Sequence, residues 1–274
     1  MKENRERQQK VVLSNEAARN ANFDLTTQQL TLLLYIISKI KPDDNSDTWY
    51  SFDLLDMAEC CGLKMSASGT YYKRLKADLL KMAARRWEPV EKDDPDHLGM
   101  TSWIGDADVH EKSGFVRVRF NPYVADFLFE LRRNYTMFEL ENILTFTSKY
   151  TIRLYIILKS YMNMDTPIEF RRETLQWKLR STDIERPIKF NDDERTPTEE
   201  ELKALNTEWR NFKPKILERA IQEINEKSDD MHITVEYKKS NRSHIVTHVR
   251  FLLTRPGIAQ KNTARLAREA LFQD

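Results

Sequence analysis

The sequence predicts a mainly helical α+β protein with two domains of one plan, each a helix-turn-helix unit followed by a β-hairpin. Three observations lead to this expectation. A length of 274 residues suits two modest domains better than one small motif. The same order of short helix, long helix and two strand-like runs occurs twice along the chain. A composition of 40% hydrophobic and 32% charged residues with six glycines fits a folded, helical chain.

The first copy of the plan precedes residue 121. Apolar residues at helical spacing, together with capping residues, predict helices at residues 27–41, 51–61 and 66–85. Ser51 or Asp53 can cap the second helix, and Gly62 stops it. Two strand-like runs follow, at residues 100–110 and 115–120, with a turn between them. A hairpin directly after a helix-turn-helix predicts a wing.

The second copy of the plan follows helical stretches between residues 121 and 164. A strand, a short helix, a long helix and a hairpin are expected at residues 168–170, 172–179, 212–226, 231–237 and 244–253. Pro214 falls in the first turn of the expected long helix, where its missing N–H costs nothing. An acidic insert at residues 181–205 separates the two helices and is expected to be a solvated loop. The expected fold is therefore a tandem winged helix, with domains at residues 1–132 and 133–260 and a tail at residues 261–274.

Cysteine usage, hydropathy and charge exclude several classes of protein. The only cysteines, Cys60 and Cys61, are adjacent and can neither staple the fold nor complete a zinc site. Residues 1–10 lack the apolar core of a signal peptide, and the longest apolar run, residues 32–37, is too short to span a bilayer. We therefore expect a cytoplasmic protein. Because the net charge is only +1, an argument for nucleic-acid binding must rest on local patches.

The long helix of the first copy has the pattern of a DNA-binding helix. Tyr72, Leu75, Leu79 and Met82 share one face, which we assign to the core. The opposite face has a small-residue gap at Ala77 with basic residues around it. Such a face can enter a major groove, where Arg reads guanine and Lys or Thr grips phosphate, although it can also be a solvated basic face without a ligand. The predicted DNA contacts on this helix are Thr70, Lys73, Arg74, Lys81 and Arg85.

The long helix of the second copy has a more varied outer face. Its apolar residues gather on one broad face and comprise Trp209, Phe212, Ile216, Leu217, Ala220 and Ile224. Its outer residues include Asn and Gln, which bond adenine, Glu, which accepts from cytosine, and Arg, which reads guanine. We therefore expect this helix to be more selective than the first. The hairpin turn adds bases suited to phosphate or the minor groove, unless it is an ordinary charged turn. The predicted contacts are Asn211, Lys213, Lys215, Arg219, Gln222, Lys238, Lys239 and Arg242.

Motifs of an enzyme are weak by comparison. The chain has no glycine-rich phosphate loop ending in Gly-Lys-Ser or Gly-Lys-Thr, which argues against an ATPase. Its five histidines lack the spacing of the metal pair in rolling-circle nicking proteins. Asp106 and Asp108 would share one strand face, as in metal-dependent primases, but no third carboxylate is evident nearby. We expect a protein that is not an enzyme and uses no cofactor and no metal.

Several segments of the sequence, taken in order, resemble theta-type plasmid replication initiators, which bind iterons. The signature helix is Phe-Lys-Pro-Lys-Ile-Leu-Glu-Arg-Ala-Ile-Gln-Glu-Ile-Asn at residues 212–225, followed by Ser228 and Asp229. Other pieces agree in order, at residues 14–17 (Ser-Asn-Glu-Ala), 150–155 (Tyr-Thr-Ile-Arg-Leu-Tyr) and 233–252. The resemblance covers residues 11–255. Each motif alone is mostly a helical core pattern, and their order and spacing make the resemblance specific.

The resemblance implies binding of repeated double-stranded DNA sites at an origin, promotion of origin opening, and recruitment of the host initiator and replicative helicase. It further implies monomers that act at the origin and homodimers, joined through the first domain, that repress their own promoter. The more varied outer face of the second long helix, rather than the resemblance, predicts that the second domain is the principal reader of DNA. The residues themselves leave three other functions open. These are a winged-helix transcriptional regulator without origin function, a metal-dependent nicking or primase-like enzyme, and a protein-interaction module that does not bind DNA.

Overall fold

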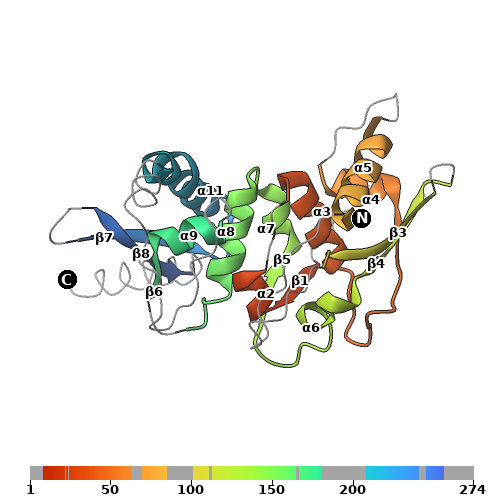
Figure 1. The fold of residues 1–274 in the computed structure, drawn as a ribbon, viewed down its shortest axis with the longest axis horizontal. Helices are drawn as coiled ribbons and strands as arrows, with labels where there is room; N and C mark the ends of the chain where they lie inside the picture. Colours follow the sequence, from red (N-terminus) through yellow and green to blue (C-terminus); the bar gives the residue numbers. More distant parts are fainter. Residues whose placement is uncertain are drawn as a thin grey trace, which may run out of the picture. The chain divides into compact units, whose positions relative to one another are not determined.

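The chain divides into two compact units, which are described here one at a time. The computed structural model describes residues 9–21, 23, 25–62, 70–84, 101–110, 113–164, 167–179, 208–240 and 245–255. The first unit is Met1–Lys149 and the second is Tyr150–Asp274 (Figure 1). The division therefore falls later than the expected boundary between residues 132 and 133. The acidic insert at residues 181–205 and the tail at residues 261–274 lie outside the described residues.

The later boundary follows from a two-stranded sheet that the sequence analysis missed. Strand β1 (Lys10–Ser14) pairs antiparallel with β5 (Tyr135–Glu139), so the segment after residue 132 belongs to the first unit. Both strands alternate buried and more exposed residues, and Val11, Leu13 and Phe138 point into the core. The helices beside this sheet are α2 (Asn15–Asn20), α6 (Ala125–Leu128) and α7 (Leu140–Thr145), with a 3₁₀ turn, η1 (Pro122–Val124).

The rest of the first unit is a winged helix. Its elements in chain order are α3 (Thr27–Ile37), β2 (Tyr50–Asp53), α4 (Leu54–Cys60), α5 (Thr70–Ala84), β3 (Ile104–His110) and β4 (Phe115–Phe120). The three strands pair antiparallel in the order β2-β4-β3, so β3 and β4 form the expected hairpin. A helix, a short strand, a helix-turn-helix and a hairpin in this order confirm the predicted plan for the first half.

Local sequence explains where the helices of the first unit begin. A capping box of Thr26 and Gln29 starts α3, whose residues from Gln29 to Ile37 are all buried. Asp53 caps α4 by accepting hydrogen bonds from the backbone N–H groups of Leu55 and Asp56. The expected helix at residues 51–61 is therefore shorter than predicted, because its first residues pair with β4 as strand β2.

The second unit repeats the plan. Its elements are α8 (Lys149–Lys159), β6 (Ile168–Arg171), α9 (Arg172–Lys178), η2 (Lys213–Leu217), α11 (Glu218–Lys227), β7 (His232–Lys239) and β8 (Val246–Thr254). The strand order β6-β8-β7 corresponds to β2-β4-β3 of the first unit. Helix α8 is buried along its length from Thr151 to Leu158, which makes it the central helix of this unit. In the described part of the chain, no helix is long and apolar enough to cross a membrane.

Candidate nucleic-acid interface

The long helix of the first winged helix, α5, has distinct buried and exposed sides. Leu75, Leu79 and Met82 are buried, which confirms the predicted core face, and Tyr71 is buried with them. Tyr72, predicted on the same face, has its side chain outside the described residues.

Helix α5 is held to α3 by a polar contact. The Asp78 carboxylate accepts hydrogen bonds from the side-chain amides of Gln28, at 2.5 Å, and Gln29, at 2.9 Å. These bonds come from the first turns of the buried helix α3, so they fix the orientation of α5 against the core.

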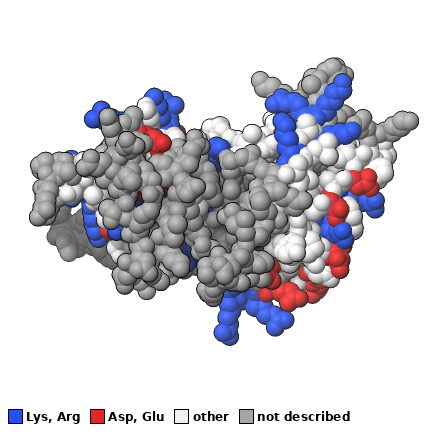
Figure 2. Space-filling model, viewed as in Figure 1, with Lys and Arg blue, Asp and Glu red and all other residues white. Residues whose placement is uncertain are grey.

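The exposed side of α5 is basic. Lys73, Arg74 and Lys81 are exposed, and none of them forms an ion pair within the part of the chain that the structure describes. Figure 2 shows Lys and Arg side chains gathered over this helix. The predicted contact Arg85 and the side chain of Thr70 lie outside the described residues. Cations without an internal ion pair suit the phosphate backbone. When they bind, they release counterions condensed on the phosphates, and no ion pair within the protein has to break.

The outer face of the first unit's three-stranded sheet is electrically balanced. Arg117 on β4 donates to Asp108 on β3 at 2.6 Å, and Arg119 donates to Asp106 at 2.6 Å and 2.9 Å. His110 Nε2 lies 2.9 Å from the same Asp108 carboxylate. The hydrogen bond from Arg117 first, and then that from His110, hold the pKa of Asp108 below its ordinary value. This sheet face therefore offers little net charge to a polyanion.

The same pairs bear on the metal-dependent alternative. Asp106 and Asp108 do share one strand face, as the sequence predicts, but the register of the sheet places an arginine opposite each of them. Their carboxylates are engaged by guanidinium groups. Within the described residues, no group of three or more His, Cys, Asp or Glu side chains could hold a metal ion.

The long helix of the second unit, residues 208–227, is called its recognition helix here, and it begins earlier than predicted. Residues 208–212 are already helical, and the helix widens into a π turn at Lys213–Leu217 before continuing as α11. Pro214 therefore does not lie in the first helical turn. A proline inside a helix has no N–H to donate and its ring crowds the preceding turn, and the wider π turn accommodates it. A local π turn is a frequent feature of functional sites in helices.

The outer face of this recognition helix is largely paired within itself. Of its predicted core residues, Trp209, Phe212, Leu217, Ala220 and Ile224 are buried, and Ile216 is half-buried. On the outside, Lys215 donates to Asn211 at 2.8 Å and Gln222 donates to Glu226 at 2.7 Å. Arg219 is exposed and forms neither a hydrogen bond nor an ion pair with the part of the chain that the structure describes. Arg219 is therefore the predicted contact on this helix with the most freedom to reach a base edge.

Lys213 belongs to a cluster that joins the recognition helix to the wing. Its ammonium lies 4.0 Å from the centre of the Tyr237 ring on β7 and 3.6 Å from the Glu218 carboxylate. Burial, followed by the nearby Glu218 carboxylate, raises the pKa of Tyr237, so the phenol stays neutral at any physiological pH. These contacts tie Lys213 to the wing strand. Less of its charge is therefore available to DNA than the sequence predicts.

The wing strands place the last predicted contacts. Lys238 is exposed but donates to Glu169 on β6 at 2.6 Å, and Arg250 on β8 donates to the same carboxylate at 3.2 Å. The hydrogen bond from Lys238 is the main cause that lowers the pKa of Glu169. Lys239 is exposed at the start of the turn, and Arg242 lies outside the described residues.

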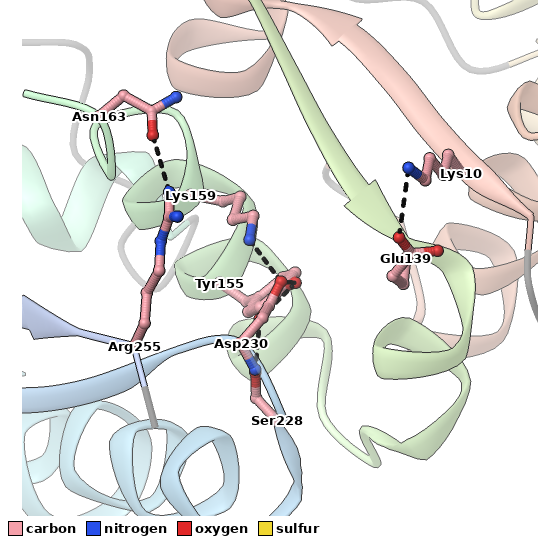
Figure 3. Close-up of polar contacts among 8 residues, drawn as sticks. All are labelled: Lys10, Glu139, Tyr155, Lys159, Asn163, Ser228, Asp230 and Arg255. Carbon is pink, nitrogen blue, oxygen red and sulfur yellow. Dashed lines mark hydrogen bonds and ion pairs between the residues drawn. The ribbon is translucent and has the colours of Figure 1, made fainter. Parts of the chain in front are cut away.

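A polar cluster that the sequence analysis missed supports the C-terminal end of the recognition helix. The Asp230 carboxylate, just after α11, accepts hydrogen bonds from Tyr155 Oη at 3.1 Å and Ser228 Oγ at 2.8 Å, and it pairs with Lys159 (Figure 3). The side-chain amide of Asn225 bonds both backbone groups of Ile233, at 2.9 Å and 2.7 Å. Asn225 and Ser228 belong to the signature motif described above, and that motif is the sequence signal that could have identified them. No sequence signal marks Asp230.

Two family models match the chain. Residues 10–159 match the model described as "Initiator Replication protein, WH1", and residues 196–253 match the model described as "Initiator Rep protein, WH2". Together they match more than half of the chain, and β6 and α9 of the second unit lie between the two matched ranges. No sequence among the curated proteins matches the chain.

Solved structures add a likeness of fold. The chain is similar to the Pi initiator protein, solved in complex with iteron DNA, with a TM-score of 0.64 and 14% identity over 89% of this chain and 96% of that one. Weaker likenesses are found to the WH1 domain of MSBI1.176, a replication protein isolated from a multiple sclerosis patient, and to domains 2 and 3 of RctB. The first has a TM-score of 0.34 and 20% identity over 49% of this chain and 97% of that one. The second has a TM-score of 0.44 and 14% identity over 82% of this chain and 81% of that one.

Proposed function

We propose that this chain, which belongs to the initiator replication protein family, starts replication of a plasmid by binding repeated double-stranded sites at its origin. The observation that carries the proposal is the presence of two winged helices in one chain, each with an exposed, polar face on its long helix. Two such modules on one duplex can read a longer site than either alone. The Pi initiator protein, which has this fold, was solved with iteron DNA.

The second unit supplies most of the sequence reading. Its recognition helix enters the major groove, where Arg219 bonds guanine O6 and N7. Asn211 and Gln222 carry side-chain amides suited to adenine, and each exchanges an internal hydrogen bond for the base contact. Lys215 and the wing residue Lys239 bind phosphates beside the groove.

The first unit mainly holds the duplex. The exposed cations Lys73, Arg74 and Lys81 on α5 contact the phosphate backbone and give binding its dependence on salt. We assign the first unit a second role as the surface that joins two chains into a dimer. Dimers of this kind repress their own promoter, and monomers act at the origin.

No covalent step is required of the protein. Binding of several chains to adjacent repeats strains the duplex and promotes its opening, because the cost of deforming DNA is repaid by the added contacts. The bound protein then recruits the host initiator and the replicative helicase. DNA binding of this kind takes place in the cytoplasm, where the plasmid lies.

Selection of bound duplexes from a random pool, followed by binding titrations, tests the reading role. Arg219→Ala should weaken binding to the selected site by about 1–3 kcal/mol and relax the preference at one base pair, as loss of a bidentate contact does. Arg133→Ala is the matched control, because it removes the same charge from an exposed loop of the first unit to which we assign no contact. An unchanged affinity and preference in Arg219→Ala would overturn its role as reader.

A replication assay tests the origin function. A plasmid that carries repeats of the selected site and this gene, with no other initiator, should be maintained in a permissive host. It should be lost when Arg219 is replaced by Ala. A protein that binds the repeats but never supports replication is a transcriptional regulator instead.

A further inference from the structure

The π turn of the recognition helix brings together two side chains that a regular α-helix would keep apart. Side chains at the spacing of Lys213 and Glu218 lie about 140° apart around the axis of an α-helix, because each residue adds about 100°. Here the backbone N–H of Glu218 donates to the carbonyl of Lys213, so this turn contains one residue more than usual. The Lys213 ammonium and the Glu218 carboxylate consequently lie 3.6 Å apart.

The wing strand β7 holds the same carboxylate from a second side. The Tyr237 hydroxyl donates a hydrogen bond to Glu218 Oε1 at 3.4 Å, and the Lys213 ammonium approaches that same oxygen. The Tyr237 ring is half-buried and meets the buried Trp209 ring edge-on, with ring centres 6.3 Å apart. Glu218 is therefore fixed both by its own helix and by the wing.

The second carboxylate oxygen of Glu218 is not used by either contact. Within the described residues, Oε2 forms no hydrogen bond and no ion pair, and the side chain is 47% exposed. Gln222 shares the same face of the helix one turn further on, and Arg219 is the next residue. Glu218 therefore presents a fixed hydrogen-bond acceptor beside two side chains to which we assign base contacts.

A carboxylate beside DNA is unfavourable unless a specific contact repays it, because the phosphates repel it. The nearby Lys213 ammonium offsets part of this repulsion. An ionised carboxylate can only accept hydrogen bonds. In the major groove cytosine presents only a donor, its N4 amino group, whereas each of the other bases presents at least one acceptor. A fixed carboxylate oxygen in the groove therefore favours cytosine over the other three bases.

We propose that Glu218 reads a cytosine in the major groove through Oε2, and that Lys213 and Tyr237 position it for this contact. This inference rests on the proposed function. The cytosine lies in a base pair next to the one that Arg219 reads, because the two side chains leave adjacent positions of one helix. The π turn thereby gives Lys213 a part in base selection, because it is this turn that brings the ammonium to Glu218.

Titrations of the full chain with duplexes selected from a random pool test the reading role of Glu218. The wild type should select cytosine next to the base pair whose preference Arg219→Ala relaxes. Exchange of that cytosine should lower wild-type affinity on the order of tenfold. In Glu218→Gln this cost should disappear, so that adenine binds at least as well as cytosine, because a glutamine amide can bond adenine. Preferences at the other positions should stay unchanged.

Tyr237→Phe tests the positioning role. It keeps the ring against Trp209 and removes only the hydroxyl that bonds Glu218. The cost of exchanging the cytosine should fall on the order of threefold, the effect of one hydrogen bond. Affinity for a random-sequence duplex should stay the same, because no phosphate contact is lost. An unchanged cost would show that Tyr237 does not position Glu218.

Asp229→Asn is the matched control, because it removes one exposed carboxylate just beyond the end of the same helix, where we assign no contact. It should keep the full preference for cytosine. If Glu218→Gln keeps that preference too, or if the wild type selects no cytosine beside the pair that Arg219 reads, the proposed contact is wrong although the protein binds DNA. If the wild-type chain selects no site from the pool, the proposed function itself fails.

Discussion

The two winged helices share one topology but differ in the outer faces of their long helices. In the first unit the recognition helix exposes Lys73, Arg74 and Lys81 without ion pairs inside the described residues, and the sheet pairs Arg117 and Arg119 with aspartates. In the second unit the recognition helix bonds Lys215 to Asn211 and Gln222 to Glu226. There Lys238 and Arg250 on the sheet both contact Glu169.

This difference indicates a division of labour. A helix of free cations binds any phosphate backbone, because the charge interaction carries no sequence information. A helix whose amides and acids already bond to one another gains binding energy from DNA only where a base edge replaces each internal hydrogen bond. Only some base sequences offer such replacements, so this binding is selective. One of the phosphate contacts proposed for the second unit lies outside this helix, at the exposed Lys239 of the wing.

The largest effect that would sharpen the comparison is expected from the support of the second recognition helix. Asp230→Ala leaves Lys159 and Tyr155 without the carboxylate that both now contact. Loss of one partner in a half-buried polar cluster costs about 1–3 kcal/mol. Hydrogen exchange of the α11 amides should therefore become about tenfold faster or more, and affinity for the selected site should fall with it.

Its control is an exposed ion pair in the first unit. Lys10 and Glu139 lie 3.8 Å apart with side chains 51% and 45% exposed (Figure 3). Glu139→Gln should change stability by less than about 1 kcal/mol, as exposed pairs do. If Asp230→Ala were as mild as Glu139→Gln, the Asp230 cluster would contribute little to holding the recognition helix.

The sequence predicts the topology of each unit better than it predicts which distant strands pair. The wing of each unit and the buried faces of α5 and α11 follow from periods of two and 3.6 residues, which depend only on local spacing. Strand β1 pairs with the distant strand β5, and Asn15, directly after β1, bonds to Thr136 on β5, 121 residues away, at 2.7 Å. No local pattern reports such a partner. The sequence therefore predicts only helical stretches between residues 121 and 164, and strand β5 was missed.

The candidate site shows the same limit at the level of side chains. Lys213 and Lys238 carry the charge that suits DNA, and the sequence places both on the correct elements. Glu169, the partner of Lys238, can be identified only once the sheet register is known, because the two residues are 69 positions apart. Composition thus predicts which surfaces are polar, and tertiary structure decides which of their charges are free.

A smaller effect distinguishes free from paired lysines on the two recognition helices. Lys73→Gln with Lys81→Gln should make the salt slope of binding to a random duplex shallower by about two units, one for each phosphate contact. Lys213→Gln should change the slope by less than one unit, because Lys213 already pairs with Glu218. Equal slopes for all of these variants and the wild type would remove the distinction between a holding and a reading helix.

The smallest effect concerns the balanced sheet of the first unit and its dependence on pH. The Arg117 hydrogen bond lowers the pKa of Asp108, so folding favours its carboxylate form. The resulting stability is fully present above the ordinary pKa of an aspartate, about 3.9, and is lost as the pH falls through the lower folded value. Because Asp108 is solvent-exposed, the effect is small.

Melting temperatures of wild type and Asp108→Asn should therefore differ by a small constant above pH 5 and converge below pH 4. Asp43→Asn, which changes an exposed aspartate in a turn of the same unit, should follow the wild type throughout. A difference for Asp108→Asn that persisted unchanged into acid would mean that the charge of Asp108 contributes nothing, and that the first sheet is balanced in geometry but not in energy.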